Sequence, residues 1–438
     1  MGYRIAQLLN RGENRQMSLS NLHRFKKPEL LLPAGSFIKL KTAFLYGADA
    51  VYAGIPEMSL RAKSKFPLED IEEGISFAHN IDKKVYLTLN LFSHNKDISI
   101  LEDFAKTVKI LNPDGIIISD PGIFQYIKKE IPNIHIHIST QANVCSWLTV
   151  DFWKNIGASL CVLGREVSFS EVKEIREKCN DIKLEMFIHG AMCVSYSGRC
   201  LISAFMASRS ANQGACVHSC RWKYKSKLLL EEELRPGEYI EMEEDDKGTY
   251  ILNSKDLCLM PKLDKIVDIG IDSFKIEGRN KSEYYVAQTS RVYRKAIDDY
   301  FDNPESWSPD KYMQELITLQ NRGYTLGFFD GVPGQEAQGY DDTASKSDYR
   351  NAGIVKANKN GFLTIELRHK LKKGDELEIL SPFKFEPIKL VLNEIYNKDN
   401  TRLVEELAPG KAHQSIKIPI KGDISLFPEN TIIRLKIL

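Results

Sequence analysis

Residues 29–53 read ELLLPAGSFIKLKTAFLYGADAVYA. Two short apolar runs, 29–32 and 50–53, flank a longer amphipathic segment, and Gly47 stands where a helix C-cap would feed the second run. Strands that alternate with helices are typical of a parallel sheet, because each parallel pair needs a crossover connection. The stretch therefore predicts one βαβ unit.

The same alternation continues along the chain, with helix-like segments such as 100–111 and 169–178. Further apolar runs of strand length lie at 84–89, 115–119, 134–139, 160–163, 184–188 and 272–276. Eight strands in this order predict an α/β fold, a (β/α)8 TIM-like barrel. A doubly wound sheet would accommodate the pattern too, but no glycine-rich dinucleotide fingerprint follows the first strand.

The chain is predicted to divide into four parts. We expect a basic, flexible leader over 1–27, the barrel over 28–301, a linker with a short helix over 302–350, and a small C-terminal all-β barrel domain over 351–438. A cysteine-rich insertion at 190–258 separates strands seven and eight. In a barrel this places the insertion at the C-terminal face, where active sites are built.

Composition is that of a soluble globular protein, with 43% hydrophobic and 27% charged residues. No apolar run is long enough to span a membrane, and the first residues lack the apolar core of a signal peptide. We therefore expect a cytoplasmic location with reduced cysteines and no membrane partner. The net charge of +1 gives no overall signal for nucleic acid.

Four of the eight cysteines crowd into residues 185–220. Six residues separate Cys193 from Cys200, and three separate Cys216 from Cys220. Four thiolates suit one tetrahedral metal ion or one cubane cluster, and the wide first gap favours iron–sulfur over zinc. Cys258 is the alternative fourth ligand, although residues 256–259 read as the apolar face of a helix.

Polar side chains recur where the predicted strands end, and in a barrel they would converge on one pocket. Any single one could instead cap a helix or pair within a loop. We predict catalytic roles for His189, Asp120 and Glu277, and substrate binding by Arg61, Asn90, His94, Gln141, Arg165 and Arg279.

These candidates suggest individual roles. His189 could protonate a substrate, donate to a cluster sulfide, or only satisfy loop carbonyls. Arg61, Arg165 and Arg279 could bind a carboxylate or phosphate, since arginine forms bidentate charge-assisted pairs. Glu277 could equally form a structural ion pair with a neighbouring arginine.

A cysteine peptidase is the rival class of enzyme. The short spacing of His189 and Cys193 does not establish a dyad, because dyads are defined in space. Neither Gly-x-Ser-x-Gly nor His-Glu-x-x-His occurs in the sequence.

Several of these segments together resemble the collagenase-like peptidase family U-32. The signature runs EMFIHGAMC at 185–193 and GRCLIS at 198–203. Further matches are LPAG at 32–35, GADAVY at 47–52, STQAN at 139–143, NSKDL at 253–257 and KIEGR at 275–279. The resemblance covers most of the chain, including the C-terminal β domain.

The resemblance implies an oxygen-independent hydroxylase with a 4Fe-4S cluster, although members of the family were long labelled proteases. The branch most like this chain hydroxylates the wobble uridine of tRNA to 5-hydroxyuridine, with prephenate as the implied oxygen donor. The length, the GACVHSCRW motif at 214–222 and the single C-terminal β domain point to it. Other branches act on ribosomal RNA cytidine or on quinone precursors, and a peptidase remains the other alternative.

The resemblance also implies ligands and partners. Cys193, Cys200, Cys216 and Cys220 would hold the cluster, with zinc as the alternative metal. Quinone-hydroxylating relatives place their last ligand further downstream, which keeps Cys258 open. The two carboxylates of prephenate match the arginines of the predicted pocket.

The tRNA anticodon region would be read as an unstacked base. Salt-dependent phosphate contacts would come from the C-terminal domain or the basic leader. A homo- or hetero-oligomer with a homologue stays open.

Overall fold

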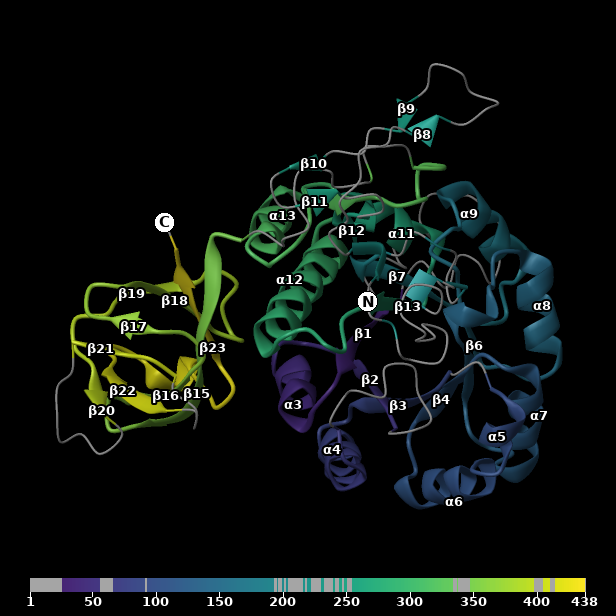
Figure 1. Cartoon of the computed structure of the whole chain (residues 1–438), viewed down its shortest axis with the longest axis horizontal. Helices are drawn as coiled ribbons and strands as arrows, with labels where there is room; N and C mark the ends of the chain where they lie inside the picture. The colour runs from purple at the N-terminus through teal and green to yellow at the C-terminus, as the bar shows by residue number, and fades with distance from the viewer. Residues whose placement is uncertain are drawn as a thin grey trace, which may run out of the picture.

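The computed structural model describes residues 26–55, 66–90, 93–192, 254–333, 347–397, 405–409 and 414–437, together with 195, 199–200, 202–203, 216, 219–221, 230–231, 239–240, 244–245, 248–249 and 337. A barrel ringed by helices lies beside a smaller, all-β domain, with α12 between them (Figure 1).

Eight parallel strands close into a barrel, which confirms the predicted fold. Strands β1 to β7 pair in chain order, and β13 pairs with both β7 and β1. Each of the eight predicted positions holds a strand. The strands are β1 (Glu29–Ala34), β2 (Ala50–Gly54), β3 (Lys84–Leu89), β4 (Gly115–Ile118), β5 (Ile136–Ile138), β6 (Leu160–Val162), β7 (Lys183–Ala191) and β13 (Ser273–Ile276).

Helices cover the outside of the barrel (Figure 1). In α6, for example, Leu101, Phe104, Ala105 and Val108 are buried at helical spacing, so one stripe of the helix packs on the strands. The helices are α3 (Phe37–Leu45), α4 (Leu68–Asn80), α5 (Asn95–Ile98), α6 (Leu101–Leu111), α7 (Pro121–Glu130), α8 (Trp147–Asn155), α9 (Phe169–Lys178), α11 (Leu263–Ile269), α12 (Glu283–Asp302) and α13 (Asp310–Ile317), with short 3-10 turns η1 (Thr140–Ala142), η3 (Ser219–Arg221), η4 (Met260–Lys262) and η6 (Ile424–Leu426).

Two further strands extend the barrel sheet at β7. Strand β12 (Asp256–Cys258) pairs antiparallel with the end of β7, and β14 (Tyr324–Thr325) pairs parallel with β12. The helical interpretation of 256–259 was therefore wrong, because so short an apolar run does not distinguish a strand from a helix. The expected linker, 302–350, contains α13 and β14.

The insertion after β7 contains two short antiparallel pairs. They are β8 (Leu230–Glu231) with β9 (Tyr239–Ile240), and β10 (Glu244–Asp245) with β11 (Gly248–Thr249).

The second domain is antiparallel β, as predicted, but it forms a half-barrel. Its main sheet has the order β19-β18-β23-β15-β16-β22-β20, and its two edge strands do not pair with each other in the described residues. The prediction of a small C-terminal all-β barrel domain is confirmed in this form. Its strands are β15 (Tyr349–Lys359), β16 (Phe362–Leu367), β17 (Leu371–Lys372), β18 (Glu376–Leu380), β19 (Ile388–Val391), β20 (Tyr396–Asn397), β21 (Glu406–Leu407), β22 (Ser415–Pro419) and β23 (Ile432–Lys436).

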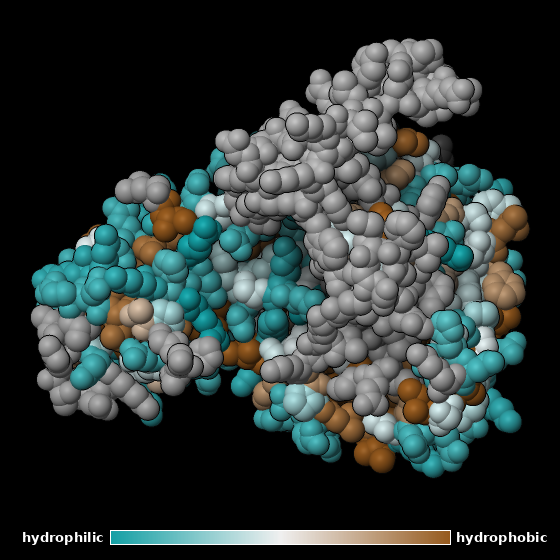
Figure 2. All heavy atoms as spheres, in the orientation of Figure 1, coloured by the Kyte–Doolittle hydropathy of each residue, from teal (hydrophilic) through white to brown (hydrophobic). Residues whose placement is uncertain are grey.

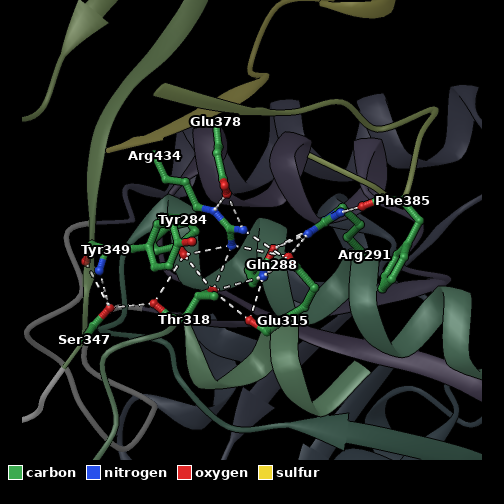
Figure 3. A network of polar contacts seen from close by, with 10 residues as sticks. All are labelled: Tyr284, Gln288, Arg291, Glu315, Thr318, Ser347, Tyr349, Glu378, Phe385 and Arg434. Atoms are coloured by element: carbon green, nitrogen blue, oxygen red, sulfur yellow. Dashed lines mark hydrogen bonds and ion pairs between the residues drawn. The ribbon is translucent and has the colours of Figure 1, made fainter. Parts of the chain in front are cut away.

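A buried polar network joins the two domains (Figure 3). Arg434 of β23 is 1% exposed and contacts the carboxylates of Glu378 in its own domain and Glu315 in α13. Its guanidinium also donates to Thr318 at 2.9 Å. Arg291 of α12 pairs with the same Glu315. A charged contact of this kind favours one relative placement of the domains. Any other placement would leave a buried charge without its partner.

The exposed hydrophobic side chains that Figure 2 shows are scattered rather than gathered on one face. The largest on the barrel helices include Ile110, Leu148 and Phe152, and Phe383 is exposed on the second domain. Scattered residues of this kind are ordinary on a globular surface. Among the described residues, no helix combines the length and the apolar character needed to cross a bilayer.

Candidate active site

Glu277 lies at the carboxyl end of the barrel, directly after β13, and is 7% exposed. The hydroxyl of Tyr52 in β2 donates to Glu277 Oε2 at 3.2 Å. Arg165, in the loop after β6, places Nη2 at 3.9 Å from the same oxygen. The barrel thus brings together two of the predicted residues, and Tyr52 holds the carboxylate in place.

Arg165 stacks on an aromatic ring at this mouth. Its guanidinium carbon lies 3.9 Å from the centroid of Phe187 in β7. The 3.9 Å separation from Glu277 is too long for a hydrogen bond, and Arg165 makes none within the described part of the chain. Its planar face is therefore fixed, and its N–H groups can donate hydrogen bonds to an incoming carboxylate.

Arg279 approaches from the loop after β13 and is 5% exposed. Its Nη1 donates to Thr88 of β3 at 3.1 Å. The backbone of Gly35 passes so close to the Arg279 carbonyl that any Cβ would collide with it. The glycine of the LPAG motif is therefore needed for this loop to close against the barrel mouth.

Below the mouth, a buried ion pair occupies the barrel interior. Lys275 donates to Glu185 at 2.7 Å, and Ser273 donates to the other carboxylate oxygen at 2.7 Å. The ammonium group also lies over the rings of Tyr52 and Phe187. This pair supports both aromatic rings that position Glu277 and Arg165.

His189 does not join this group, because β7 carries a bulge. Lys275 pairs with Phe187 while Ile276 pairs with His189, so Ile188 is the extra residue that reverses the side-chain alternation. The imidazole consequently packs outside the barrel among Tyr285, Tyr293 and Tyr324, and its Nδ1 lies 3.3 Å from the Tyr293 hydroxyl.

This placement argues against the predicted catalytic role of His189. The residue is 1% exposed, and burial lowers its pKa to about 3. The imidazole is therefore neutral at physiological pH, and it lies on the outer face of β7, although the His189 carbonyl accepts from the Glu277 amide at 2.8 Å. Strict alternation along β7 would have placed the imidazole on the same face as Phe187, inside the barrel. The bulge that turns it outward cannot be seen in the sequence.

Cys258 lies on the same outer side. Its Sγ is 3.7 Å from the Tyr293 hydroxyl and 3.7 Å from Met313 Sδ, and the residue is 1% exposed. Burial raises the pKa of the thiol to about 11. A thiol that binds a metal loses its proton, so Cys258 stays the alternative fourth ligand.

Two predicted site residues are helix caps. Asp120 accepts from the Ile123 amide at 3.0 Å at the start of α7. The backbone amide of His94 donates to Asp97 at 2.9 Å at the start of α5, and His94 is exposed. Asp120 and His94 therefore occupy N-cap positions, and their roles in catalysis and substrate binding stay predictions.

The remaining predicted residues are partly described. Gln141 sits in η1 after β5, and its buried Oε1 has no hydrogen-bond partner within the described residues. Asn90 follows β3 and is half-buried. Arg61 lies outside the described residues. A buried amide oxygen at the mouth is an acceptor that a substrate N–H could satisfy.

A serine hydroxyl ties the two cysteine pairs together. Ser203, three residues after Cys200, places Oγ 3.6 Å from Cys216 Sγ and 3.3 Å from Ser219 Oγ. Ser219 immediately precedes Cys220. The second pair is thus held near the first by a residue that ends the GRCLIS signature but was not predicted to have a role of its own.

The cysteines match a metal-binding set by their chemistry. Cys200, Cys216 and Cys220 form no disulfide within the described residues, and Cys193 lies outside them. Within the part of the chain that is described, no three potential metal-binding side chains converge on one point. The donors fit a thiolate site because all four belong to one segment and Ser203 draws its two halves together.

Comparison with known families covers both domains. Residues 35–339 match the family described as Peptidase family U32, and residues 347–434 match the Peptidase family U32 C-terminal domain. The first match ends at residue 339 and the second begins at residue 347, so α13 and β14 belong to the first.

Curated relatives match over nearly the whole chain. The "tRNA hydroxylation protein P1" of Bacillus subtilis is 40% identical, and the match covers 92% of this chain and 94% of the relative. The "tRNA hydroxylation protein P" of Escherichia coli is 36% identical over 91% and 95%. A protein of Porphyromonas gingivalis named "Collagenase" is 30% identical over 90% and 95%.

Proposed function

The chain belongs to peptidase family U32, and from this premise we propose that it hydroxylates tRNA at the mouth of its barrel. The observation that carries the proposal is the near-complete match to relatives named tRNA hydroxylation proteins. The base would be the wobble uridine, converted to 5-hydroxyuridine, and the oxygen would come from prephenate without molecular oxygen. The enzyme would act in the cytoplasm.

The barrel mouth supplies a binding site for the co-substrate. Arg165 has a fixed ring contact and uncommitted N–H groups, so it would bind one carboxylate of prephenate. Arg279 lies across the mouth on Thr88 and would contact the second. Two arginines from different strand ends suit a dicarboxylate better than a neutral substrate.

Glu277 is the proton-holding group in this proposal. Tyr52 fixes one carboxylate oxygen, which aims the group into the mouth beside Arg165. It would accept or return the proton at the base that is hydroxylated. Gln141 would accept from a uracil N–H, since its buried oxygen lacks a partner in the described residues.

Cys193, Cys200, Cys216 and Cys220 would hold a 4Fe-4S cluster, with a single zinc ion as the alternative. When bound, such a cluster would supply one-electron redox chemistry. Ser203 would orient the Cys216 thiolate by hydrogen bonding.

The tRNA would enter with its anticodon base unstacked, because an enzyme that modifies a base needs that base outside the stack. The second domain would contact the phosphates. Its rigid attachment through Arg434 gives the RNA a surface of fixed shape next to the mouth.

A peptidase is the second candidate, favoured by the relative named Collagenase. The described residues offer little support for a cysteine–histidine dyad. His189 is buried behind the barrel against Tyr293, and Cys258 beside it is buried as well. A peptide could not reach either group without opening the sheet.

The experiment that tests the proposal is mass spectrometry of tRNA nucleosides from a strain lacking this chain and any paralogue. We expect 5-hydroxyuridine and its derivatives to disappear, and to return with the wild-type gene but not with Glu277→Gln. Unchanged derivatives in the deletion strain would refute the proposal. A Lys129→Gln gene, altered on an exposed face of α7, is the matched control and should restore them.

A further inference from the structure

A polar cavity of about 450 Å³ opens at the opposite, amino-terminal end of the barrel. Its floor is formed by the buried residues Tyr86, His137, Leu160 and Ser273. Its rim includes exposed lysines at the starts of β3 and β7. The volume is within the range of roughly 300–1,000 Å³ for small-molecule sites, and no part of the proposed hydroxylation uses it.

Each carboxylate that lines this cavity already has a donor. Glu29 accepts from Lys84 and from the Tyr86 hydroxyl, at 2.9 and 3.0 Å. Asp272 pairs with Arg176 and accepts from the Leu184 amide. Asp49 pairs with Arg294 and accepts from the Leu30 amide. Asp298 forms ion pairs with Lys27 and Arg294. The acids therefore leave little unmet charge for a cationic ligand.

Unused donors remain on the same lining. Lys26 and Lys183 have no acidic partner within the described residues. His137 is 5% exposed, and its buried Nδ1 makes no hydrogen bond within the described part of the chain. Its ring packs on Tyr86 at 4.5 Å between centroids, which fixes its orientation on the floor. Buried polar atoms without partners are rare in proteins and call for a bound group.

We propose that this cavity binds a small oxyanion, either a phosphate or a carboxylate. Lys183 and Lys26 would contact the anion from the rim, and His137 would donate its ring N–H from the floor. The site is separate from the barrel mouth, so the inference does not depend on the proposed function.

The direct test is calorimetric titration of the full chain with inorganic phosphate and, separately, with acetate, at constant ionic strength set by chloride. We expect saturable binding of at least one anion. Lys183→Gln should weaken it about tenfold, which is about 1.4 kcal/mol. Lys173→Gln, on an exposed face of α9, is the matched control and should bind like the wild type.

The two titrations distinguish the two kinds of oxyanion. Binding of acetate alone would show that the site takes a carboxylate, and binding of phosphate alone that it takes a phosphate. A perturbed imidazole nitrogen resonance of His137 on addition of the bound anion would support the floor contact without any mutation. Absence of saturable binding in both titrations, or equal affinity in Lys183→Gln, would overturn the proposal and leave water in the cavity.

Discussion

At the residue scale, the candidate site depends on how a few side chains are held rather than on which ones occur. Arg165 and Glu277 were predicted from their positions after strands, and the barrel brings them within 3.9 Å. Tyr52 and Phe187, which orient them, were missed because aromatic residues inside strands look like ordinary core. His189 was misplaced because one bulge reverses the alternation.

Two substitutions of Arg165 separate the contribution of its positive charge from that of its planar guanidinium group. We expect Arg165→Lys to lower kcat/KM for the dicarboxylate co-substrate by about tenfold and Arg165→Leu by about a hundredfold, since each tenfold is about 1.4 kcal/mol. Steady-state kinetics with varied co-substrate would measure this. Equal losses for tRNA and for the co-substrate would contradict a specific carboxylate contact.

The neutral imidazole of His189 makes a prediction about pH. Its folded-state pKa is about 3, below the ordinary value of about 6.5. The unfolded chain therefore binds the proton first as the pH falls, and stability present above pH ~6.5 is lost progressively down to pH ~3. His189→Gln should reduce the stability lost between pH 7.5 and 5.5 by about 1.4 kcal/mol.

Urea unfolding at the two pH values would check this. A Gln side chain can still bond to Tyr293, so the variant is expected to fold. The same pH dependence in the variant and the wild type would show that the imidazole is not held neutral.

At the element scale, the strands and helices followed from periodicity, whereas their ends and irregularities did not. Alternation of apolar runs and amphipathic segments marked all eight barrel strands. Strand β12 was predicted as a helix because its partner, the end of β7, is about 65 residues away in the sequence. A local pattern of apolar residues does not reveal so distant a pairing. Alternation also predicted the all-β second domain, but it gives strands and not the pairing of the edges that makes the sheet a half-barrel.

The end of β7 should be intolerant of any side chain at Gly190. Its φ is +118°, and a Cβ would lie 2.5 Å from the Glu277 carbonyl oxygen. Gly331 has φ +123° with open space around it. Both Gly→Ala changes introduce backbone strain, but Gly190→Ala should cost about 1–3 kcal/mol more because of the collision.

The free energies of unfolding of the two variants, measured in urea, give this difference. Gly190→Ala should also lower hydroxylation, since the collision displaces Glu277. Similar stability of the two variants would mean that the approach of β7 to Glu277 is looser than described.

At the scale of the whole molecule, the two domains behave as one body because charged side chains are buried between them. Arg434 reaches both Glu378 and Glu315, and Tyr46 of the barrel donates to the Leu380 carbonyl of β18. The sequence marked the two domains by composition, but their contact surface joins residues more than a hundred positions apart. Pairings of this separation have no local signature.

Removal of Arg434 should uncouple the domains. Arg434→Leu leaves Glu315 and Glu378 with less compensation, so we expect a loss of about 3–5 kcal/mol. Lys370→Leu, at an exposed ion pair with Glu406 within the second domain, should cost far less. Calorimetry should show one transition for the wild type and two for Arg434→Leu. A single unshifted transition would contradict the coupling.

The measurement that tests the account most directly is an anaerobic reaction of the purified, iron- and sulfide-reconstituted chain with unmodified tRNA and prephenate, read by nucleoside mass spectrometry. We expect uridine heavier by one oxygen atom with the wild type and with Lys129→Gln. We expect no hydroxylated uridine with Glu277→Gln or Cys200→Ser. Unmodified uridine with a fully reconstituted wild-type chain, or undiminished product with Glu277→Gln, would contradict a hydroxylation site at the barrel mouth.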